Sequence, residues 1–150
     1  MKELRIKRMR PGAALPLRGT SRSAGCDLCA CIDEPLLLPA GGRVSVPTGI
    51  AVEPVCAPGE HVGGFVFGRS GLGIRHGIVP SNAVGVIDED YRGEILVGLS
   101  NLSDTDYRIQ PGERIAQLVF LPVLLPEIVE CEALSDTPRG EGGFGSTGRM

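Results

Sequence analysis

The chain has 150 residues, of which 42% are hydrophobic and 22% charged, and its formal net charge is −3. This size and balance favour one globular domain, and the negative charge argues against a nucleic-acid-binding surface. No run approaches the roughly 18 apolar residues of a membrane span, and the basic first ten residues are not followed by the apolar stretch of a secretory signal. We therefore expect a cytoplasmic protein with neither nucleic acid nor membrane as a partner.

The cysteines are an odd set of five, namely Cys26, Cys29, Cys31, Cys56 and Cys131. The spacing of Cys26 and Cys29 would suit half of a zinc site, but no second pair follows, and His61 and His76 lack ligand spacing. We expect reduced cysteines that serve as small core residues, which implies a reducing compartment.

Short apolar runs, broken by turn residues about every 8–12 positions, predict an all-β fold of the sandwich or barrel type. The 22 glycines and 12 prolines also favour turns over long helices. The predicted strands are Leu4–Met9, Gly25–Ala30, Leu36–Leu38, Arg43–Pro47, Gly49–Glu53, His61–Phe67, Ile78–Val79, Ala83–Ile87, Glu94–Ser100, Tyr107–Ile109, Arg114–Phe120 and Glu127–Cys131. A short helical turn is expected only at Ser70–His76.

Two further expectations concern connections. The strands at 83–87 and 94–98 flank an acidic, polar loop and are expected to pair as a β-hairpin. Beyond residue 134 the apolar runs stop, so we expect a β domain over residues 1–134 and a mobile arm over residues 135–150.

Two single residues and one turn could belong to a ligand site. Asp27 stands among small and apolar residues, so it needs a partner such as a turn N–H, an arginine or metal-bound water. Residues 68–73 combine an arginine, a hydroxyl and backbone N–H groups that suit phosphate oxygens, although an ordinary turn is equally consistent. Gln117 falls on the face of Ile115 and Val119, where it either lines a ligand site or is a satisfied core amide.

Asp88 is the candidate general base. It directly follows the apolar Val86 and Ile87, so we expect it to be better anchored than Glu89 or Asp90 in the same acidic loop. A solvated loop is the alternative. No Ser/His/Asp triad is readable, which disfavours nucleophilic catalysis. The remaining chemistry is phosphate binding, one positioned carboxylate and a Mg²⁺ ion held mainly by substrate phosphates.

The segment 139–149 has no apolar periodicity and contains five glycines. Arg139, Ser146 and Thr147 suit phosphate oxygens, and Phe144 offers a flat face for a base. Such a segment closes over a ligand or, in the alternative reading, serves as a flexible solubilising tail.

Five segments resemble, in order, the five motifs of the homotrimeric dUTPase family: Ala24–Leu28, Arg69–Leu72, Asn82–Gly93, Arg114–Leu118 and Arg139–Gly148. The resemblance implies a jelly-roll-like distorted β-barrel with a flexible glycine-rich C-terminal arm. It also implies a homotrimer with active sites at subunit interfaces. The implied reaction is Mg²⁺-dependent hydrolysis of dUTP to dUMP and pyrophosphate, which limits uracil incorporation into DNA and supplies dUMP for thymidylate synthesis.

The resemblance also implies roles for single residues. Asp88 matches the carboxylate that orients the water attacking the α-phosphorus, and Arg69 matches the arginine that supports this carboxylate. Asp27 and Gln117 match residues that hold Mg²⁺-bound water or phosphate. The other implied substrate contacts are Ser70 and Gly71 at the phosphates, Asn82, Val86, Ile87 and Leu96 at the uracil, Tyr91 at the deoxyribose, and Arg139, Phe144, Gly145, Ser146 and Thr147 in the arm.

Cys26, Gly68 and Gly73 depart from the usual family pattern, and Gly68, which stands where proline is common, is expected to loosen the loop before Arg69. Two other functions stay open. A dCTP deaminase on the same scaffold would need a catalytic glutamate, for which no candidate is obvious. A non-catalytic nucleotide-binding regulatory module could dispense with Asp88 and the arm, yet both are present.

Overall fold

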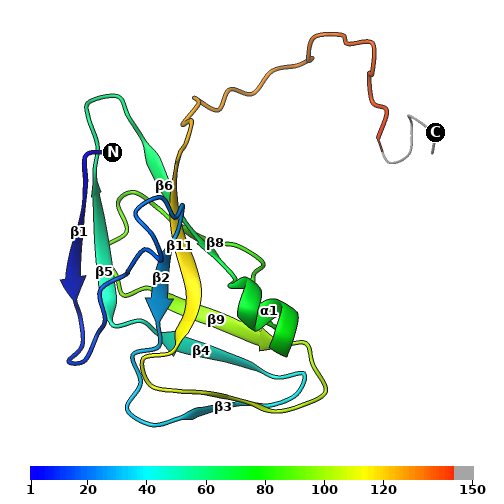
Figure 1. Ribbon diagram of the computed structural model, residues 1–150. Coiled ribbons are helices and arrows are strands. Elements are labelled where there is room, and N and C mark those ends of the chain that lie inside the picture. Colours follow the sequence, from blue (N-terminus) through cyan, green and yellow to red (C-terminus); the bar gives the residue numbers. More distant parts are fainter. Residues whose placement is uncertain (144–150) are drawn as a thin grey trace.

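The computed structural model describes residues 1–143, which form strands and one short helix (Figure 1). The strands are β1 (Glu3–Arg8), β2 (Cys26–Cys29), β3 (Leu36–Leu38), β4 (Arg43–Pro47), β5 (Ile50–Val55), β6 (Val62–Phe67), β7 (Ile78–Pro80), β8 (Gly85–Ile87), β9 (Leu96–Asn101), β10 (Tyr107–Ile109) and β11 (Arg114–Pro122). The helix α1 spans Ser70–His76. The all-β class and the helical turn are therefore confirmed. Within the described residues, this seven-residue helix is too short to cross a membrane.

All strand pairs are antiparallel. The largest sheet has the order β2-β11-β6-β8, and a second sheet has the order β4-β9-β7. β1 pairs with β5, and β10 pairs with β3. Across residues 1–143 these sheets do not join into one closed barrel. The four-stranded sheet carries β2 on one edge and β8 on the other.

The hairpin predicted at 83–98 is wrong. β8 pairs with β6, whereas β9 pairs with β4 and β7, so the two segments belong to different sheets. The loop between them, residues 88–95, is longer than the two to five residues or so of a typical hairpin loop. The strands therefore separate instead of forming a ladder.

The strand predicted at Glu127–Cys131 is also wrong. Beyond Val123, whose N–H donates to the His61 carbonyl at 3.0 Å, residues 124–143 form no strand and lead away from the body of the chain (Figure 1). Ile128 is 96% exposed. A strand needs a partner for its backbone N–H and C=O groups, and within residues 1–143 nothing pairs with this segment.

The core is aliphatic, as the small number of aromatic residues requires. Its largest fully buried apolar side chains are Leu28, Leu38, Val46, Ile50, Ile78, Ile95, Leu99, Ile109, Ile115 and Leu118. Two buried polar side chains are satisfied by backbone carbonyls: the Thr48 hydroxyl donates to Ile95 at 2.7 Å, and the Asn101 amide donates to Thr105 at 2.8 Å. Among residues 1–143, no buried side-chain nitrogen or oxygen lacks a hydrogen-bond partner, so these polar groups fasten loops to the core at no such cost.

The prediction that the cysteines are reduced core residues is confirmed only in part: Cys31 packs against the buried core, but none of the five is fully buried. All five are free, four are half-buried, and Cys131 is exposed. Around β2 the buried positions belong to Leu28 and Ala30, so the alternating Cys29 and Cys31 fall outside the fully buried set. Within residues 1–143 no cluster of cysteine, histidine and carboxylate side chains could hold a metal ion.

Gly49 occupies a tight backbone junction of the fold. Its φ is +71°, and an added Cβ would lie 2.7 Å from both the Ala13 Cβ and the Cys31 Sγ. Its carbonyl accepts the Met9 N–H at 2.7 Å, and its own N–H donates to Glu94 at 2.9 Å. The turn between β4 and β5 thus holds the segment after β1 by direct backbone contact, which only glycine permits.

We predict that Gly49→Ala lowers the free energy of unfolding by about 2–4 kcal/mol, because a left-handed backbone and an overpacked contact both oppose the methyl group. Gly59→Ala is the matched control, since Gly59 has a φ of +78° but open space around its Cβ position. The control should cost only about 1–2 kcal/mol. Urea unfolding of both variants measures the difference, and equal losses would refute the packing argument.

Candidate functional site

The first half of the site is an ion cluster around Asp27 on β2. Its two carboxylate oxygens accept hydrogen bonds from two arginines, Arg69 Nε at 2.9 Å and Arg114 NH1 at 3.1 Å. Arg69, the residue before α1, also donates to the Arg114 carbonyl at 3.1 Å. The Asp27 side chain is only 15% exposed. Of the partners that the sequence left open for Asp27, the structure supplies arginine.

The cluster is built by strand pairing. β2 lies against β11, with Asp27 opposite Gln117, so the β2 carboxylate and the β11 arginine meet at one end of the sheet. Burial raises the pKa of the neighbouring Cys29 thiol, and the Asp27 charge raises it further. Strand pairing therefore gathers Arg69 and Arg114 around the Asp27 carboxylate at this edge of the sheet. Such an arginine-rich edge can receive an anion such as phosphate.

Gln117 holds the loop that leads into α1. Its side-chain amide donates to the Gly68 carbonyl at 3.1 Å, and an added Cβ at Gly68 would lie 3.0 Å from Pro80. The hydrogen bond ties the loop to β11, and the close approach of Pro80 leaves little room for a side chain at position 68. Ser70 and Gly71, which begin α1, are exposed beside the ion cluster, and no side chain caps the helix. Their exposed groups therefore face solvent next to two arginines.

The second half of the site is the space between β8 and β9. It forms a cavity of about 120 Å³, lined by Val66, Pro80, Asn82, Gly85, Val86, Ile87, Leu96, Val97 and Gly98. β7 covers β9 only at its end, Leu99–Asn101. The predicted residues Asn82, Val86, Ile87 and Leu96 are thus brought together, although not by a hairpin. Beside Asn82, Ala83 has a φ of +62°, a conformation that costs energy in a residue with a side chain.

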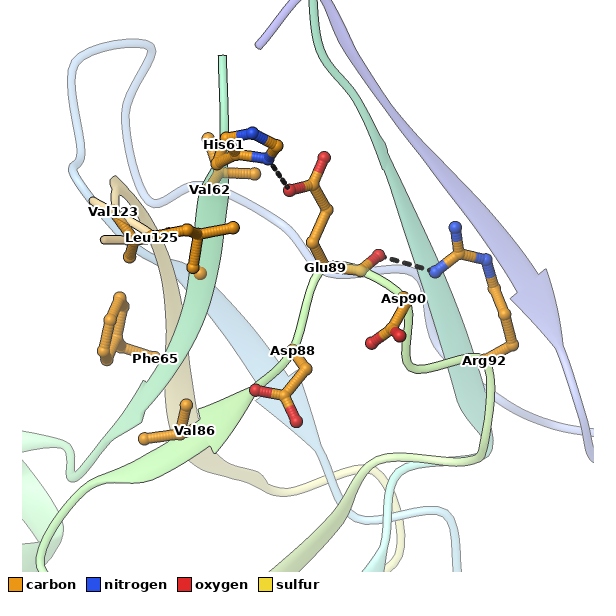
Figure 2. A pocket seen from close by; sticks show the side chains of 11 residues that line it. His61, Val62, Phe65, Val86, Asp88, Glu89, Asp90, Arg92, Val123 and Leu125 are labelled. Carbon is orange, nitrogen blue, oxygen red and sulfur yellow. Dashed lines mark hydrogen bonds and ion pairs between the residues drawn. The ribbon is translucent and has the colours of Figure 1, made fainter. Parts of the chain in front are cut away.

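Asp88 follows β8 and is exposed (Figure 2). Within residues 1–143 no hydrogen bond or ion pair reaches its carboxylate, whereas the neighbouring Glu89 binds His61 Nδ1 at 3.0 Å. The expectation that Asp88 is better anchored than Glu89 is therefore wrong. Its carboxylate faces a cavity of about 670 Å³ between its loop and β6, with Phe65, Val86 and Val123 among the lining residues.

Tyr91 is fixed more tightly. Its hydroxyl donates to the Glu94 carbonyl at 3.0 Å, and its backbone N–H donates to the Asp88 carbonyl at 3.1 Å. Gly93 makes this possible, because an added Cβ there would lie 2.3 Å from the tyrosine oxygen. A hydrogen bond from Arg10 lowers the pKa of Glu94, which keeps this end of the loop charged and anchored. Tyr91 and Asp88 consequently share one turn.

The two halves do not meet within one chain. Asp27 on β2 and Asp88 after β8 lie at opposite edges of the four-stranded sheet, with β11 and β6 between them. Three strand spacings correspond to roughly 14 Å. Arg69 is bound to Asp27 and makes no contact with Asp88 among the described residues. Any site that uses both halves must therefore bring together two edges.

The arm residue Arg139 is exposed, and its Nε donates to the nearby Gly142 carbonyl at 2.8 Å. The predicted contacts Phe144, Gly145, Ser146 and Thr147 lie outside the described residues. The sequence reasoning missed Arg114 as a side chain of the ion cluster. The signal was its position three residues before Gln117, which becomes informative only when β11 is placed beside β2.

A family model described as dUTPase matches residues 12–148. The chain belongs to the dUTPase family. A deoxyuridine 5'-triphosphate nucleotidohydrolase of Desulfitobacterium hafniense is 48% identical over 134 residues, which cover 89% of this chain and 87% of the relative. The enzyme of the same name from Salmonella typhimurium is 44% identical over 153 residues, or 99% of both chains. The family membership places this chain among nucleotide-hydrolysing enzymes.

Solved structures agree with this assignment. The dUTPase of Staphylococcus bacteriophage 80alpha, solved with dUPNHPP, is 28% identical and covers 99% of both chains with a TM-score of 0.84. This likeness confirms the jelly-roll-like fold that the resemblance implied. Two features of the chain match a charged, base-bearing ligand such as a dUTPase binds. One is the arginine-rich edge, and the other is the cavity of about 120 Å³ between β8 and β9, called the slot below.

We predict that Asp27→Asn lowers the free energy of unfolding by about 1.5–3 kcal/mol, because two guanidinium groups then face each other without their shared charge. Glu53→Gln is the matched control: Glu53 also bridges two arginines, Arg5 and Arg92, but its side chain is 41% exposed. The control should change stability little, since solvent screens exposed pairs. Urea unfolding of the two variants compares them, and equal effects would contradict the role of burial.

Proposed function

We propose that this chain hydrolyses dUTP to dUMP and pyrophosphate with Mg²⁺, at sites built from the two half-sites of neighbouring chains in a homotrimer. The proposal rests on one observation: the same sheet carries two different groups of side chains. Arginines lie at its β2 edge, and the slot followed by Asp88 and Tyr91 lies at its β8 edge. In the cell, this reaction would limit uracil incorporation into DNA and supply dUMP for thymidylate synthesis.

The slot between β8 and β9 is the proposed uracil site. Its volume of about 120 Å³ is well below the roughly 300–1,000 Å³ of pockets for whole drug-sized ligands, so it suits one ring. Within residues 1–143, no strand pairs with β9 at Leu96 and Val97 on the side that faces β8. Backbone N–H and C=O groups can therefore read the polar edge of a base, which discriminates better than an apolar wall does.

Asp88 and Tyr91 take the positions beyond the slot. A free carboxylate can accept a proton from a water molecule and orient it toward the α-phosphorus. The Tyr91 ring is fixed by its hydrogen bond to the Glu94 carbonyl and packs closely over Gly93. We propose that this rigid ring lies against the deoxyribose and would clash with a 2′-hydroxyl. Arg69, Ser70, Gly71 and Gln117 are proposed to bind the phosphates of a nucleotide whose base lies in another chain's slot.

Magnesium fits this chain as an ion that the triphosphate carries. Mg²⁺ usually combines one or two carboxylates with substrate phosphates and waters, and within residues 1–143 no group of three candidate ligands is present. Asp27 suits a contact through water, because each of its oxygens keeps an acceptor lone pair beyond its arginine bond. When bound, Mg²⁺ would neutralise charge on the phosphate oxygens.

The proposed trimer also accounts for exposed apolar surface. Val119, Phe65 and Val86 form a row across the outer face of the four-stranded sheet, and Val86 is 63% exposed. Leu124 and Ile128, beyond β11, are 93% and 96% exposed. A second copy that covers this surface would bury it and bring a β2 edge toward a β8 edge. We propose that the arm from Arg139 onward then closes over the nucleotide.

The reaction is tested by measuring pyrophosphate release from dUTP, dCTP, dTTP and UTP with Mg²⁺. We expect release from dUTP alone, because the slot reads the base and Tyr91 reads the sugar. Asp88→Asn should lower kcat at least about a hundredfold and leave the Kd for a non-hydrolysable dUTP analogue within about threefold, because the carboxylate acts on water and not on the base. Release of ammonia from dCTP would point to deaminase-like chemistry, pyrophosphate release from dCTP would contradict base reading by the slot, and binding without release would point to a regulatory module.

The shared site is tested by mixing two inactive variants, Arg69→Gln and Asp88→Asn. After co-refolding in equal amounts, about one quarter of wild-type activity should return, because each site then has one chance in two of an intact Arg69 and one in two of an intact Asp88. Light scattering should give three times the chain mass of 15.8 kDa. No recovery in a mixed trimer would show that both residues serve a site within one chain.

A further inference from the structure

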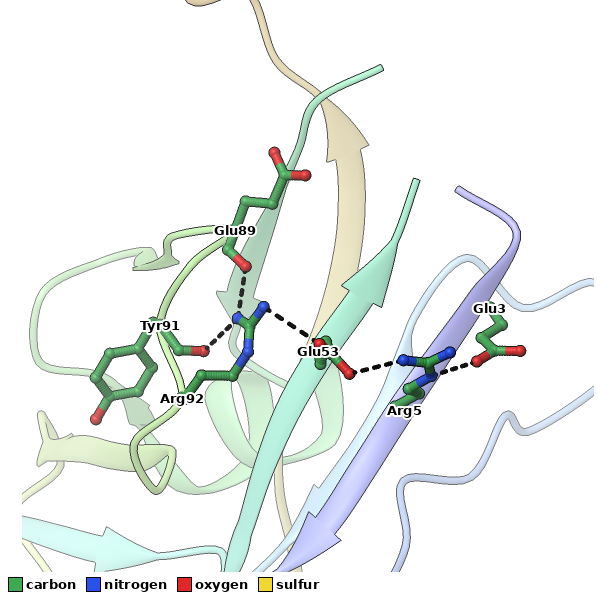
Figure 3. A network of polar contacts seen from close by, with 6 residues as sticks. All are labelled: Glu3, Arg5, Glu53, Glu89, Tyr91 and Arg92. Carbon is green, nitrogen blue, oxygen red and sulfur yellow. Dashed lines mark hydrogen bonds and ion pairs between the residues drawn. The ribbon is translucent and has the colours of Figure 1, made fainter. Parts of the chain in front are cut away.

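The loop after β8, residues 88–95, carries two of the proposed functional side chains but has no regular structure. Polar contacts of Arg92 with Glu89 and Tyr91 in the loop and with Glu53 on β5 hold it in place (Figure 3). A loop of this length loses conformational entropy whenever it is ordered. The contacts that order the loop therefore set the fraction of molecules in which Asp88 and Tyr91 are correctly placed for the proposed hydrolysis.

Arg92 makes the contacts that close this turn. Its NH1 donates to the Glu89 carbonyl at 2.7 Å and to the Tyr91 carbonyl at 3.1 Å. Its NH2 lies 3.7 Å from the Glu53 carboxylate on β5. One guanidinium thus binds two backbone groups of the turn and one fixed strand, which a planar group with several donors can do at once.

His61 supplies a second attachment. It precedes β6, and its Nδ1 lies 3.0 Å from the Glu89 carboxylate (Figure 2). The residue that follows Asp88 is therefore held through its side chain by His61 and through its carbonyl by Arg92. Asp88 itself keeps a free carboxylate on a restrained backbone, which is the arrangement that a water-orienting group requires.

We infer that Arg92 is a positioning residue for the hydrolysis: it anchors the turn 88–91 to β5 through Glu53, and so holds Asp88 and Tyr91 toward the nucleotide. This inference rests on the proposed function. In this role Arg92 touches no substrate atom. It acts only through its hydrogen bonds to the backbone carbonyls of Glu89 and Tyr91.

Stability alone does not explain the contacts. The Arg92 and Glu53 side chains are 50% and 41% exposed, and exposed ion pairs contribute little to the free energy of folding. The chain also offers an internal comparison, because Arg5 binds the same Glu53 carboxylate at 3.3 Å from the opposite side without touching the loop (Figure 3). Arg5 therefore shares the ion pair but lacks the positioning contacts.

The test compares Arg92→Gln with the matched control Arg5→Gln in the full-length chain. We expect Arg92→Gln to lower kcat for dUTP about tenfold and to narrow the preference for dUTP over UTP, since misplacement of about 1 Å at a reacting group is costly. Arg5→Gln should stay within about twofold of wild type. Arg92→Lys should recover only part of the loss, because an ammonium group keeps the charge but loses the planar fork. Both glutamine variants should unfold at nearly the same temperature.

The outcomes are separable. If the wild-type chain does not hydrolyse dUTP, the proposed function fails. If it does and Arg92→Gln matches Arg5→Gln in kcat and in dUTP preference, only the role of Arg92 is overturned. A loss of activity that follows a matching loss of thermal stability would likewise overturn the positioning role, because it would make Arg92 a structural residue.

Discussion

The pairing of β11 with β6 is the interaction on which the rest of the site depends. Six residue pairs, from Gln117 opposite Phe67 to Pro122 opposite Val62, run down the middle of the four-stranded sheet. This ladder sends buried side chains such as Leu118 and Val66 into the core. It also leaves both outer edges available, one for β2 and one for β8. The distance between the two half-sites is therefore set by strand spacing and not by flexible loops.

Asp27 and Glu53 each bind two arginines, but the two carboxylates differ in burial and therefore in what they stabilise. Asp27 is 15% exposed and sits within the ion cluster, so its charge holds Arg69 and Arg114 in place. Glu53 is 41% exposed and forms part of a surface network from Glu3 to Arg92. The buried pair shapes a binding surface, whereas the exposed network attaches a loop to a strand.

The strands and the helical turn were predictable because each depends on a local pattern, such as the apolar alternation of β11 or the turn residues around α1. Pairing was not predictable from local pattern. β8 and β9 are close in sequence, yet they do not pair with each other. β8 forms its backbone hydrogen bonds with β6, and β9 forms its own with β4. The segment at 127–131 has strand-like residues but no partner within residues 1–143. Likewise, Asp27 could be recognised as needing a partner, but only the register of β2 and β11 identifies Arg114.

The slot between β8 and β9 has a consequence for solubility. Unpaired strand edges, which we propose to read a base, are equally able to pair with a foreign strand, which is how edges promote aggregation. β8 has only three residues, and the loop after it carries Asp88, Glu89 and Asp90. A short edge followed by three negative charges discourages a second chain from extending the sheet. The acidic loop to which we assign the water-orienting carboxylate therefore also protects the free chain from aggregation.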